Sequence, residues 1–259
     1  MAGQLHSYPE LLADAHTQCP SITGRRIVIT GGTTGIGRAT AILLASEGAN
    51  LFICGRSQQH LDDALQRINL LGNGRGMSCD LAQPSMPGEM LDQASDALSG
   101  IDTVIVNAAV SADDLAGTEQ DQIDYQLAVD FTAWIATAKA AIERMKDGGD
   151  LVFIGSTSAV SRSPGSSVYV ATKAGIQGFV QALRLELGER DIKVGLVEPG
   201  LTGSDMQYGD YSSEEQRELI GKDQMLRAED IAVAVYFVLT QPRRTNISLV
   251  RVESRLKPE

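Results

Sequence analysis

The sequence has few of the residues from which metal centres, disulfide frameworks and nucleic-acid surfaces are built. Its three histidines all precede residue 61, and its three cysteines, Cys19, Cys54 and Cys79, are odd in number and widely spaced. We therefore expect no metal and no disulfides. Only 22 basic residues stand against 33 acidic ones, a net charge of −11. Because phosphates and anionic lipids need a basic face, we expect neither nucleic acid nor a membrane as partner.

Long apolar runs are missing too. No run of 18 apolar residues is found, and the first residues, MAGQLHSYPE, lack the charged and then apolar pattern of an export signal. Together with reduced cysteines, this favours a cytoplasmic location. A length of 259 residues, with 43% hydrophobic and 5% aromatic residues, suits one domain around one buried core.

From Arg25 onward, short β-branched runs alternate with longer segments of helical period. The expected strands lie near 26–30, 50–55, 75–79, 102–107, 150–155, 192–197 and 247–252. The expected helices lie near 35–48, 57–71, 86–99, 119–145, 166–189, 212–224 and 228–239. This alternation predicts a doubly wound parallel sheet, a Rossmann fold with three α/β/α layers in a single domain. We expect residues 1–22 to form an arm outside a domain of residues 23–259.

A glycine-rich turn follows the first expected strand. The strand, RIVIT, ends in TGGTTGIG at residues 30–37 and runs into a helix. Glycines let the backbone approach a pyrophosphate, and the helix N-terminus offers unpaired N–H groups and the positive end of its dipole. A merely tight turn is the alternative, but the position between the first strand and its helix favours dinucleotide binding.

The end of the second expected strand indicates which dinucleotide binds. NAD-binding chains usually place an acid there, which bonds the ribose hydroxyls. Here Gly55 takes that place and Arg56 follows, and a guanidinium matches a phosphate in a bidentate fork. Ser57 adds a hydroxyl, and Arg38 could reach the same phosphate. We therefore expect NADP(H) in preference to NAD(H); the alternative is that Arg56 is a solvated surface residue.

A tyrosine and a lysine stand at i and i+4 in Tyr169-Val-Ala-Thr-Lys173, on one face of an expected helix. A free phenol, with a pKa near ~10, is a poor acid or base at neutral pH, and a neighbouring ammonium lowers that pKa. Ser156 lies thirteen residues before Tyr169. The tyrosine–lysine pair favours proton transfer at a carbonyl oxygen, with a packed or surface Tyr169 as the alternative.

The TG-x-x-x-G-x-G loop, Ser156 and the Tyr-x-x-x-Lys pair resemble the short-chain dehydrogenase/reductase family, and ordered motifs extend the resemblance from about Thr23 onward. It implies an oxidoreductase acting on CH–OH with NAD(P) as acceptor, and a homodimer or homotetramer. Tyr169 would exchange the proton, Ser156 would bond the substrate oxygen, and Lys173 would also hold the nicotinamide ribose. Asp80 would bond the adenine amino group, unless it only caps a helix.

The remaining cofactor contacts that the resemblance implies lie in the glycine turn, at strand ends and in the loop at 199–204, which also reads as a plain Pro-Gly turn. The full expected set is Gly31, Thr33, Thr34, Gly35, Ile36, Gly37, Arg56, Ser57, Asp80, Leu81, Asn107, Ala108, Ala109, Tyr169, Lys173, Pro199, Gly200, Thr202 and Ser204. Val106 and Ala109 depart from the family's usual Asn-Asn-Ala-Gly.

Asp130 is a further departure, because the family usually has Asn at this position of the segment VDFT. We count Asp130 with the catalytic residues Ser156, Tyr169 and Lys173. A carboxylate there should favour the charged form of Lys173 and alter the pH dependence of the reaction.

Substrate specificity is expected to lie in a polar insert at about 203–226, the mobile lid of this family, and in the loop after the fifth strand. We expect Ser158, Arg162, Met206 and Tyr208 to contact the substrate, although the last three could be solvated surface residues. The expected substrate is a small carbonyl compound or its secondary alcohol. Two alternatives are a 3-oxoacyl-carrier-protein reductase, disfavoured by the net charge of −11, and an NADP(H)-binding redox sensor without turnover.

Overall fold

The structure is a computed structural model, and it describes residues 19–111, 114–145, 148–162, 164–207 and 210–257. Seven strands form one sheet in the order β3-β2-β1-β4-β5-β6-β7, with every neighbouring pair parallel. Their bounds are β1 Arg26–Thr30, β2 Asn50–Gly55, β3 Asn73–Ser78, β4 Thr103–Val106, β5 Asp150–Ile154, β6 Lys193–Pro199 and β7 Leu249–Val252. The predicted doubly wound α/β sheet is confirmed.

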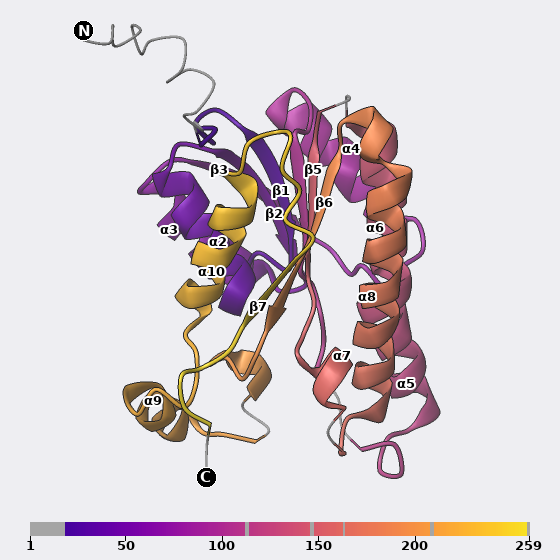
Figure 1. The fold of residues 1–259 in the computed structure, drawn as a ribbon, viewed down its shortest axis with the longest axis vertical. Coiled ribbons are helices and arrows are strands. Elements are labelled where there is room, and N and C mark those ends of the chain that lie inside the picture. The colour runs from indigo at the N-terminus through magenta and orange to yellow at the C-terminus, as the bar shows by residue number, and fades with distance from the viewer. Residues whose placement is uncertain (1–18, 112–113, 146–147, 163, 208–209, 258–259) are drawn as a thin grey trace, which may run out of the picture.

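Helices cover both faces of the sheet (Figure 1). One face carries α2 (Gly35–Ser46), α3 (Gln58–Asn69) and α10 (Ala228–Leu239), and the other carries α4 (Met86–Leu98), α6 (Ala133–Arg144) and α8 (Ser167–Glu186). The central strands are mainly apolar, with polar residues at or near their ends, because both of their faces are buried. In β1, Ile27 and Ile29 pack into one core and Val28 into the other.

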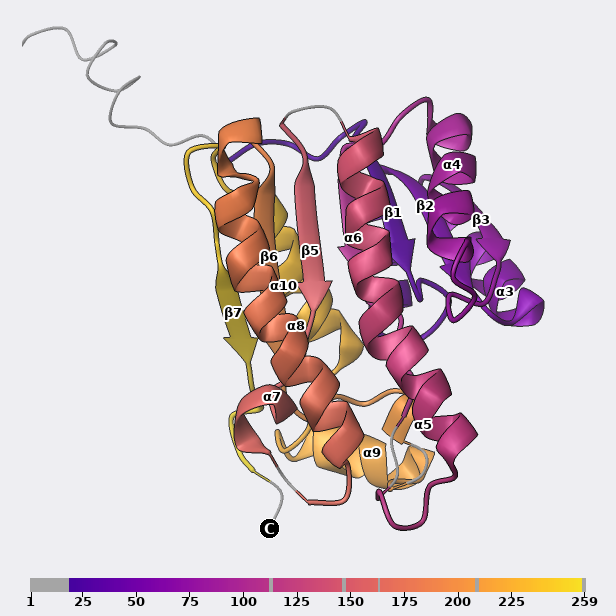
Figure 2. The same cartoon turned by 90° about the vertical axis from the view of Figure 1, so that its right-hand side faces the viewer.

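Shorter helices lie mostly toward the carboxyl end of the strands, at the bottom of Figures 1 and 2. They are α5 (Gln120–Leu127), α7 (Ser158–Ser161), α9 (Ser213–Gly221), the π-helix η1 (Ala128–Thr132) and the 3₁₀ turns η2 (Gly188–Arg190) and η3 (Asp205–Gln207). The expected insert at 203–226 holds η3 and α9. No helix in the described ranges has the length and apolar character needed to cross a bilayer.

One expected helix is divided in the structure. The segment predicted as a single helix over 119–145 consists of α5, η1 and α6 in succession. A π-helical turn adds a residue to the helical repeat and so changes which side chains face inward. Here it buries Val129 and Asp130. The sequence also did not predict α7, which ends at Arg162 in the left-handed region with φ of 53°.

Ile22, the last residue of the arm that was expected outside the core, lies in the core. The first 18 residues of the expected arm are outside the described residues, but Ile22 is buried and packs into the core beside α2 and α3. The backbone of Gly24 then bonds to Gly48, which ties the chain to the end of α2 before β1 begins.

A buried carboxylate gathers three cations at the amino end of the sheet. Asp150, 3% exposed, lies within 3.3 Å of Arg25, 3.5 Å of Lys193 and 3.2 Å of Arg243. Arg25 directly precedes β1, Asp150 and Lys193 begin β5 and β6, and Arg243 follows α10. The cluster therefore ties together elements that are distant in sequence.

Asp150→Asn should lower the free energy of unfolding by about 3 kcal/mol, because it leaves three cations without their buried counter-charge. Urea denaturation measures this change. Asp96→Asn, at an exposed position of α4, is the control and should change stability little. Nucleotide binding should be the same in both variants, and a loss of binding in Asp150→Asn alone would contradict a purely structural role.

Candidate functional site

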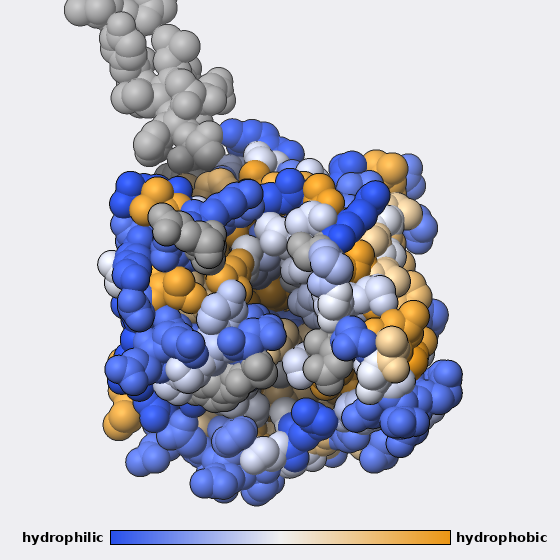
Figure 3. Space-filling model, turned by 90° about the horizontal axis from the view of Figure 1, so that it is seen from below, coloured by the Kyte–Doolittle hydropathy of each residue, from blue (hydrophilic) through white to orange (hydrophobic). Residues whose placement is uncertain are grey.

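A cleft opens at the carboxyl end of the strands, as expected for a doubly wound sheet. It has two adjoining halves of about 520 Å³ and about 500 Å³. Five residues line both halves: Ile36, Asn107, Ala109, Ser204 and Met206. Figure 3, which looks onto this end of the molecule, shows the hollow at the centre of the face. We call the first the glycine-loop half, because it contains Gly31 and Gly35, and the second the tyrosine half, because it contains Tyr169.

The glycine-loop half is built around the turn from β1 to α2. Gly31 and Gly35 have φ of 64° and 50°, which favour glycine. A Cβ on Gly37 would lie 2.1 Å from the Gly31 carbonyl oxygen, so the turn closes only without that atom. Asn107 fastens the turn to β4, because its side-chain amide donates to the carbonyl oxygens of Thr30 at 3.1 Å and Gly31 at 3.0 Å.

The start of α2 is open to a ligand. Thr34 occupies the N-cap position in extended conformation, yet its side chain makes no capping hydrogen bond. The first N–H groups of the helix are therefore available to an anion at the positive end of the helix dipole. Together with the close backbone approach at Gly31 and Gly37, this turn fits the pyrophosphate of a dinucleotide.

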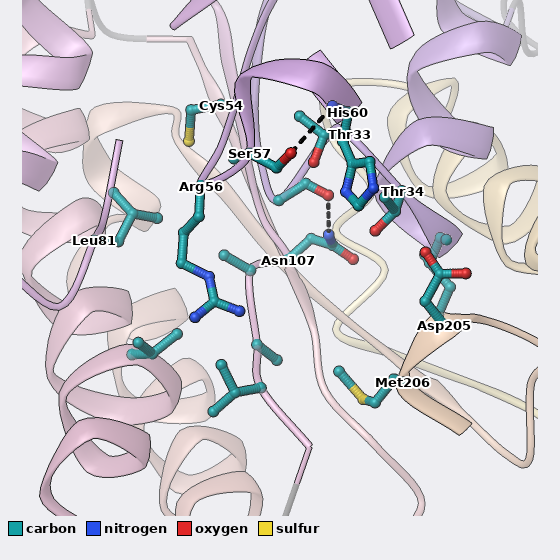
Figure 4. Close-up of a pocket in the computed structure, with 18 of the residues that line it drawn as sticks. Thr33, Thr34, Cys54, Arg56, Ser57, His60, Leu81, Asn107, Asp205 and Met206 are labelled. Atoms are coloured by element: carbon teal, nitrogen blue, oxygen red, sulfur yellow. Dashed lines mark hydrogen bonds between the residues drawn. The ribbon is translucent and has the colours of Figure 1, made fainter. Parts of the chain in front are cut away.

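Arg56 extends into the glycine-loop half from the end of β2 (Figure 4). Its guanidinium donates to the Tyr125 hydroxyl at 2.9 Å, and that hydroxyl donates to Asp80 at 3.1 Å. The remaining guanidinium donors of this exposed side chain are free for a phosphate. A Cβ at Gly55 would lie 2.4 Å from the Thr33 hydroxyl oxygen, so an acid at this position would displace Thr33.

The neighbouring basic and hydroxyl groups have other partners. Arg38 bonds to Asp63 at 3.0 Å and does not line the cleft, so the structure does not place it where the sequence suggested a phosphate. Ser57 lines the cleft but also caps α3, where its hydroxyl accepts from the His60 N–H at 3.3 Å. Within the part of the chain that the structure describes, Arg56 is the arginine of this half with spare donors.

The tyrosine half contains Ser156, Tyr169 and Lys173. Ser156 follows β5, and the other two lie one turn apart on α8. The Ser156 hydroxyl oxygen accepts from the Ser158 N–H at 3.1 Å, which leaves the hydroxyl proton free to donate. The Lys173 Nζ lies 5.3 Å from the centre of the Tyr169 ring. The expected convergence of these three side chains is therefore present in the geometry.

Lys173 is enclosed to an unusual degree for a lysine, with 2% of its surface exposed. Its Nζ donates to the Ile154 carbonyl at 3.4 Å and lies 3.9 Å from the centre of the Trp134 ring, a cation–π contact. Trp134 is held in turn by a 2.7 Å hydrogen bond from its indole N–H to the Ala108 carbonyl. These contacts replace only part of the hydration that the ammonium loses.

Burial is the largest influence on the pKa values of Lys173 and Tyr169. Loss of hydration lowers the pKa of Lys173 to about 8, although the charge of Asp130 acts in the opposite direction. The packing around Tyr169 raises the pKa of its phenol to about 12, opposed by hydrogen bonding with Ser156 and reinforced by Asp130. The pKa of Tyr169 is thus raised where a lowering by Lys173 was expected, because desolvation of the phenol is the largest influence on it.

Asp130 is fully buried in η1 and does not line the cleft. One carboxylate oxygen accepts from the Val110 N–H at 2.9 Å, and the other has no hydrogen-bond partner among the described residues. Burial raises the pKa of Asp130 to about 6, against the attraction of the Lys173 charge. Between these two pKa values both side chains are charged, so Asp130 acts on Lys173 through its charge and not from the wall of the cleft.

Most of the residues predicted from the sequence line the cleft. In the glycine-loop half they are Gly31, Thr33, Thr34, Gly35, Ile36, Arg56, Ser57, Asp80, Leu81, Asn107, Ala108 and Ala109. In the tyrosine half they are Ser156, Ser158, Tyr169, Lys173, Pro199, Gly200, Thr202, Ser204 and Met206. Gly37 shapes the turn from behind. Arg162 is exposed and lines neither half, and Tyr208 lies outside the described residues.

Two aromatic residues of the site escaped the sequence analysis. Tyr125 contacts Arg56 and Asp80 from α5, and Trp134 contacts Lys173 from α6. Neither stands in a motif, and both reach the site only because the helix pair carrying them packs on the sheet beside β4. Composition could have drawn attention to Trp134, because it is the only tryptophan in the sequence, but nothing in the composition distinguishes Tyr125.

The comparisons with known proteins agree with this geometry. A protein-family model described as short chain dehydrogenase matches residues 25–215. An uncharacterised oxidoreductase of Staphylococcus aureus strain MRSA252 is 28% identical over 234 residues, which cover 89% of this chain and 97% of that protein.

Two solved structures illustrate the similarity in three dimensions. A short chain dehydrogenase from Burkholderia cenocepacia J2315 in complex with NADP has a TM-score of 0.81 and 30% identity, over 90% of this chain and 98% of that one. A blue fluorescent protein from a metagenomic library, in complex with NADPH, has a TM-score of 0.80 and 26% identity, over 91% and 98% of the two chains.

A Rossmann fold with a glycine turn after its first strand defines a dinucleotide-binding enzyme. Within that class, the match over residues 25–215 shows that this chain belongs to the short-chain dehydrogenase/reductase family. It is therefore an oxidoreductase that acts on CH–OH groups with NAD(P) as acceptor.

Asp130→Asn should shift the pH profile of alcohol oxidation to lower pH by about one unit. The Asp130 charge raises the pKa of both Lys173 and Tyr169, so its removal lets each lose its proton at lower pH. The measurement is kcat/KM for alcohol oxidation from neutral to alkaline pH. Asp124→Asn, on the exposed surface of α5, is the matched control. An unchanged profile would exclude Asp130 from the electrostatics of the reaction.

Proposed function

We propose that this chain is an NADP(H)-dependent oxidoreductase that interconverts a carbonyl and a secondary alcohol on a small organic substrate. The observation that carries this proposal is the convergence of Ser156, Tyr169 and Lys173 on one half of a cleft whose other half is the glycine turn. A substrate oxygen between Ser156 and Tyr169 would lie beside the site for the reactive end of a dinucleotide.

The preference for NADP(H) rests on Arg56 and Gly55. A 2′-phosphate needs a cation with free donors, and Arg56 supplies them in the glycine-loop half. An acid at position 55, which would repel that phosphate, is absent, and Thr33 fills the space that its Cβ would need. The NADP and NADPH complexes of the two similar structures support the same preference.

The residues of the tyrosine half take the following roles. A bound nicotinamide dinucleotide supplies or accepts the hydride at the substrate carbon, and in its oxidised form it adds a positive charge. In reduction, Tyr169 is protonated at neutral pH, since the pKa of its phenol is about 12, and donates its proton to the substrate oxygen as the C=O becomes CH–OH. In oxidation, Tyr169 must first lose its proton, and its phenolate then takes the hydroxyl proton of the alcohol, while a bound oxidised dinucleotide would accept the hydride.

Ser156 and Lys173 support that proton transfer. Ser156, oriented by the Ser158 N–H, donates to the substrate oxygen and stabilises the negative charge that develops there. Lys173 is mainly charged at neutral pH because its pKa of about 8 lies above that range, and its ammonium stabilises charge on Tyr169 as the proton leaves.

Tyr169→Phe should reduce kcat/KM by at least about 100-fold, because the acid is lost while the ring is kept. The measurement is NADPH consumption with a panel of small ketones and aldehydes, and NADP⁺ reduction with the matching alcohols. NADPH binding should be unchanged, as followed by quenching of protein fluorescence. Full activity in the variant would refute the role of Tyr169, and tight NADPH binding without any turnover in the parent protein would favour a redox sensor.

Arg56→Ala should weaken NADPH binding by about 10- to 100-fold and change NADH binding little. The reason is that the guanidinium would bind the 2′-phosphate of NADPH, which NADH lacks. Titration calorimetry with both nucleotides measures the difference. Arg67→Ala is the control. It removes an exposed arginine of α3, the helix that follows Arg56, and should leave both affinities unchanged. Equal losses for the two nucleotides in Arg56→Ala would contradict the assignment.

A further inference from the structure

The outer wall of the tyrosine half carries exposed or half-buried polar side chains that have no partner among the described residues. Six line it: Ser111, Ser158, Ser166, Gln207, Asp210 and Tyr211. They come from three separate places, after β4, around α7 and between η3 and α9. None of their side chains makes a hydrogen bond or an ion pair with another described residue. Elsewhere in the chain, serines of this kind cap helices, as Ser57 and Ser212 do.

The charges of this half are equally informative. Asp210 and Lys173 are its only charged side chains within the described ranges. Lys173 is enclosed and already contacts the Ile154 carbonyl and Trp134. Arg162, the cation expected to hold an acidic substrate, lies outside the cleft. A carboxylate on the substrate would therefore find no counter-ion at the outer wall and would lie near the like charge of Asp210.

Hydroxyl groups suit this wall better than other substituents. A hydroxyl both donates and accepts, so it can pair with a serine or tyrosine hydroxyl, with the Gln207 amide or with the Asp210 carboxylate. An apolar chain would remove water from all six groups and leave them unpaired, which costs free energy for each group. The half has a volume of about 500 Å³ and must also admit the reactive end of the dinucleotide, so the substrate is small.

We propose that the substrate is a small polyhydroxylated carbonyl compound or the corresponding polyol, without a carboxylate, held by this hydroxyl-rich wall and by Asp210. The inference rests on the proposed function and keeps the same hydride and proton transfer. It adds the substrate class and assigns specificity to Asp210 and the unpartnered serines, in place of Arg162.

The first test compares three ketones with the same carbon chain and NADPH as reductant. One carries hydroxyls and ends in CH₂OH, the second ends in a carboxylate in place of that group, and the third has no hydroxyls and ends in CH₃. We expect kcat/KM of the first to exceed the other two by at least about tenfold. A preference for the carboxylate or the methyl compound overturns the inference.

The second test uses variants of the wall. In Asp210→Asn, the ratio of kcat/KM for the CH₂OH compound to kcat/KM for the carboxylate compound should fall by at least about fivefold. We expect the fall to come mainly from a higher kcat/KM for the carboxylate compound, because the like charge is removed. Glu214→Gln, an exposed acid of the same insert that does not line the cleft, is the control and should leave the ratio unchanged. An unchanged ratio in Asp210→Asn overturns the role of Asp210.

Ser166→Ala tests the hydroxyls themselves. It should raise KM for the polyhydroxylated ketone by about threefold to tenfold and leave kcat nearly unchanged, because Ser166 would bind the substrate away from the reacting carbon. KM for the methyl compound should not rise. An equal effect on both compounds would show a general change of the loop and would contradict a specific contact.

A reference substrate distinguishes a failure of the proposed substrate class from a failure of the proposed oxidoreductase activity. A small activated diketone tests the activity alone, and fluorescence quenching tests NADPH binding alone. If the diketone and the carboxylate ketone are reduced and the polyhydroxylated one is not, the proposed function stands and this inference falls. If NADPH binds and no carbonyl compound is reduced, both fall.

Discussion

The arrangement of the tyrosine half depends on an ammonium group that is almost fully buried. Lys173 is held against the Ile154 carbonyl and the Trp134 ring, with 2% of its surface exposed and without an ion pair among the described residues. The cost of that burial lowers the pKa of Lys173 to about 8, and the pKa values of Tyr169 and Asp130 are raised in the same enclosure. Charges next to the buried Lys173 and Asp130 are therefore weakly screened.

Because the sheet is parallel, the loops that surround Lys173 all lie at the carboxyl end of the strands, where the cleft opens. Every strand ends at the same edge, so the glycine turn after β1, Asn107 after β4, Ser156 after β5 and Thr202 after β6 meet in one cleft. The opposite edge carries structural charge, centred on the buried Asp150. The ion-pair cluster around Asp150 and the cleft therefore lie at opposite ends of the strands.

Charged side chains of both signs line each half of the cleft, although the net charge of the chain is −11. In the glycine-loop half, Arg56 has spare donors and lies among residues that include the carboxylates Asp80 and Asp205. In the tyrosine half, Lys173 and Asp210 are the charged side chains within the described ranges. We propose that Arg56 binds a phosphorylated ribose and that Asp210 favours a neutral substrate rich in hydroxyls. An overall charge excludes classes of partner, but local charges determine which small molecule binds.

The sequence by itself determined the strands, the glycine turn and the Ser156, Tyr169 and Lys173 pattern, because these depend on local periodicity and on spacing within one turn or loop. Only the tertiary structure decided that a π-helical turn buries Asp130, that Trp134 covers Lys173, that Tyr125 supports Arg56 and that Arg162 lies outside the cleft. It also reversed the expected direction of the Tyr169 pKa. The physical reason is that burial and through-space contacts depend on which elements pack together, and spacing along the chain does not record them.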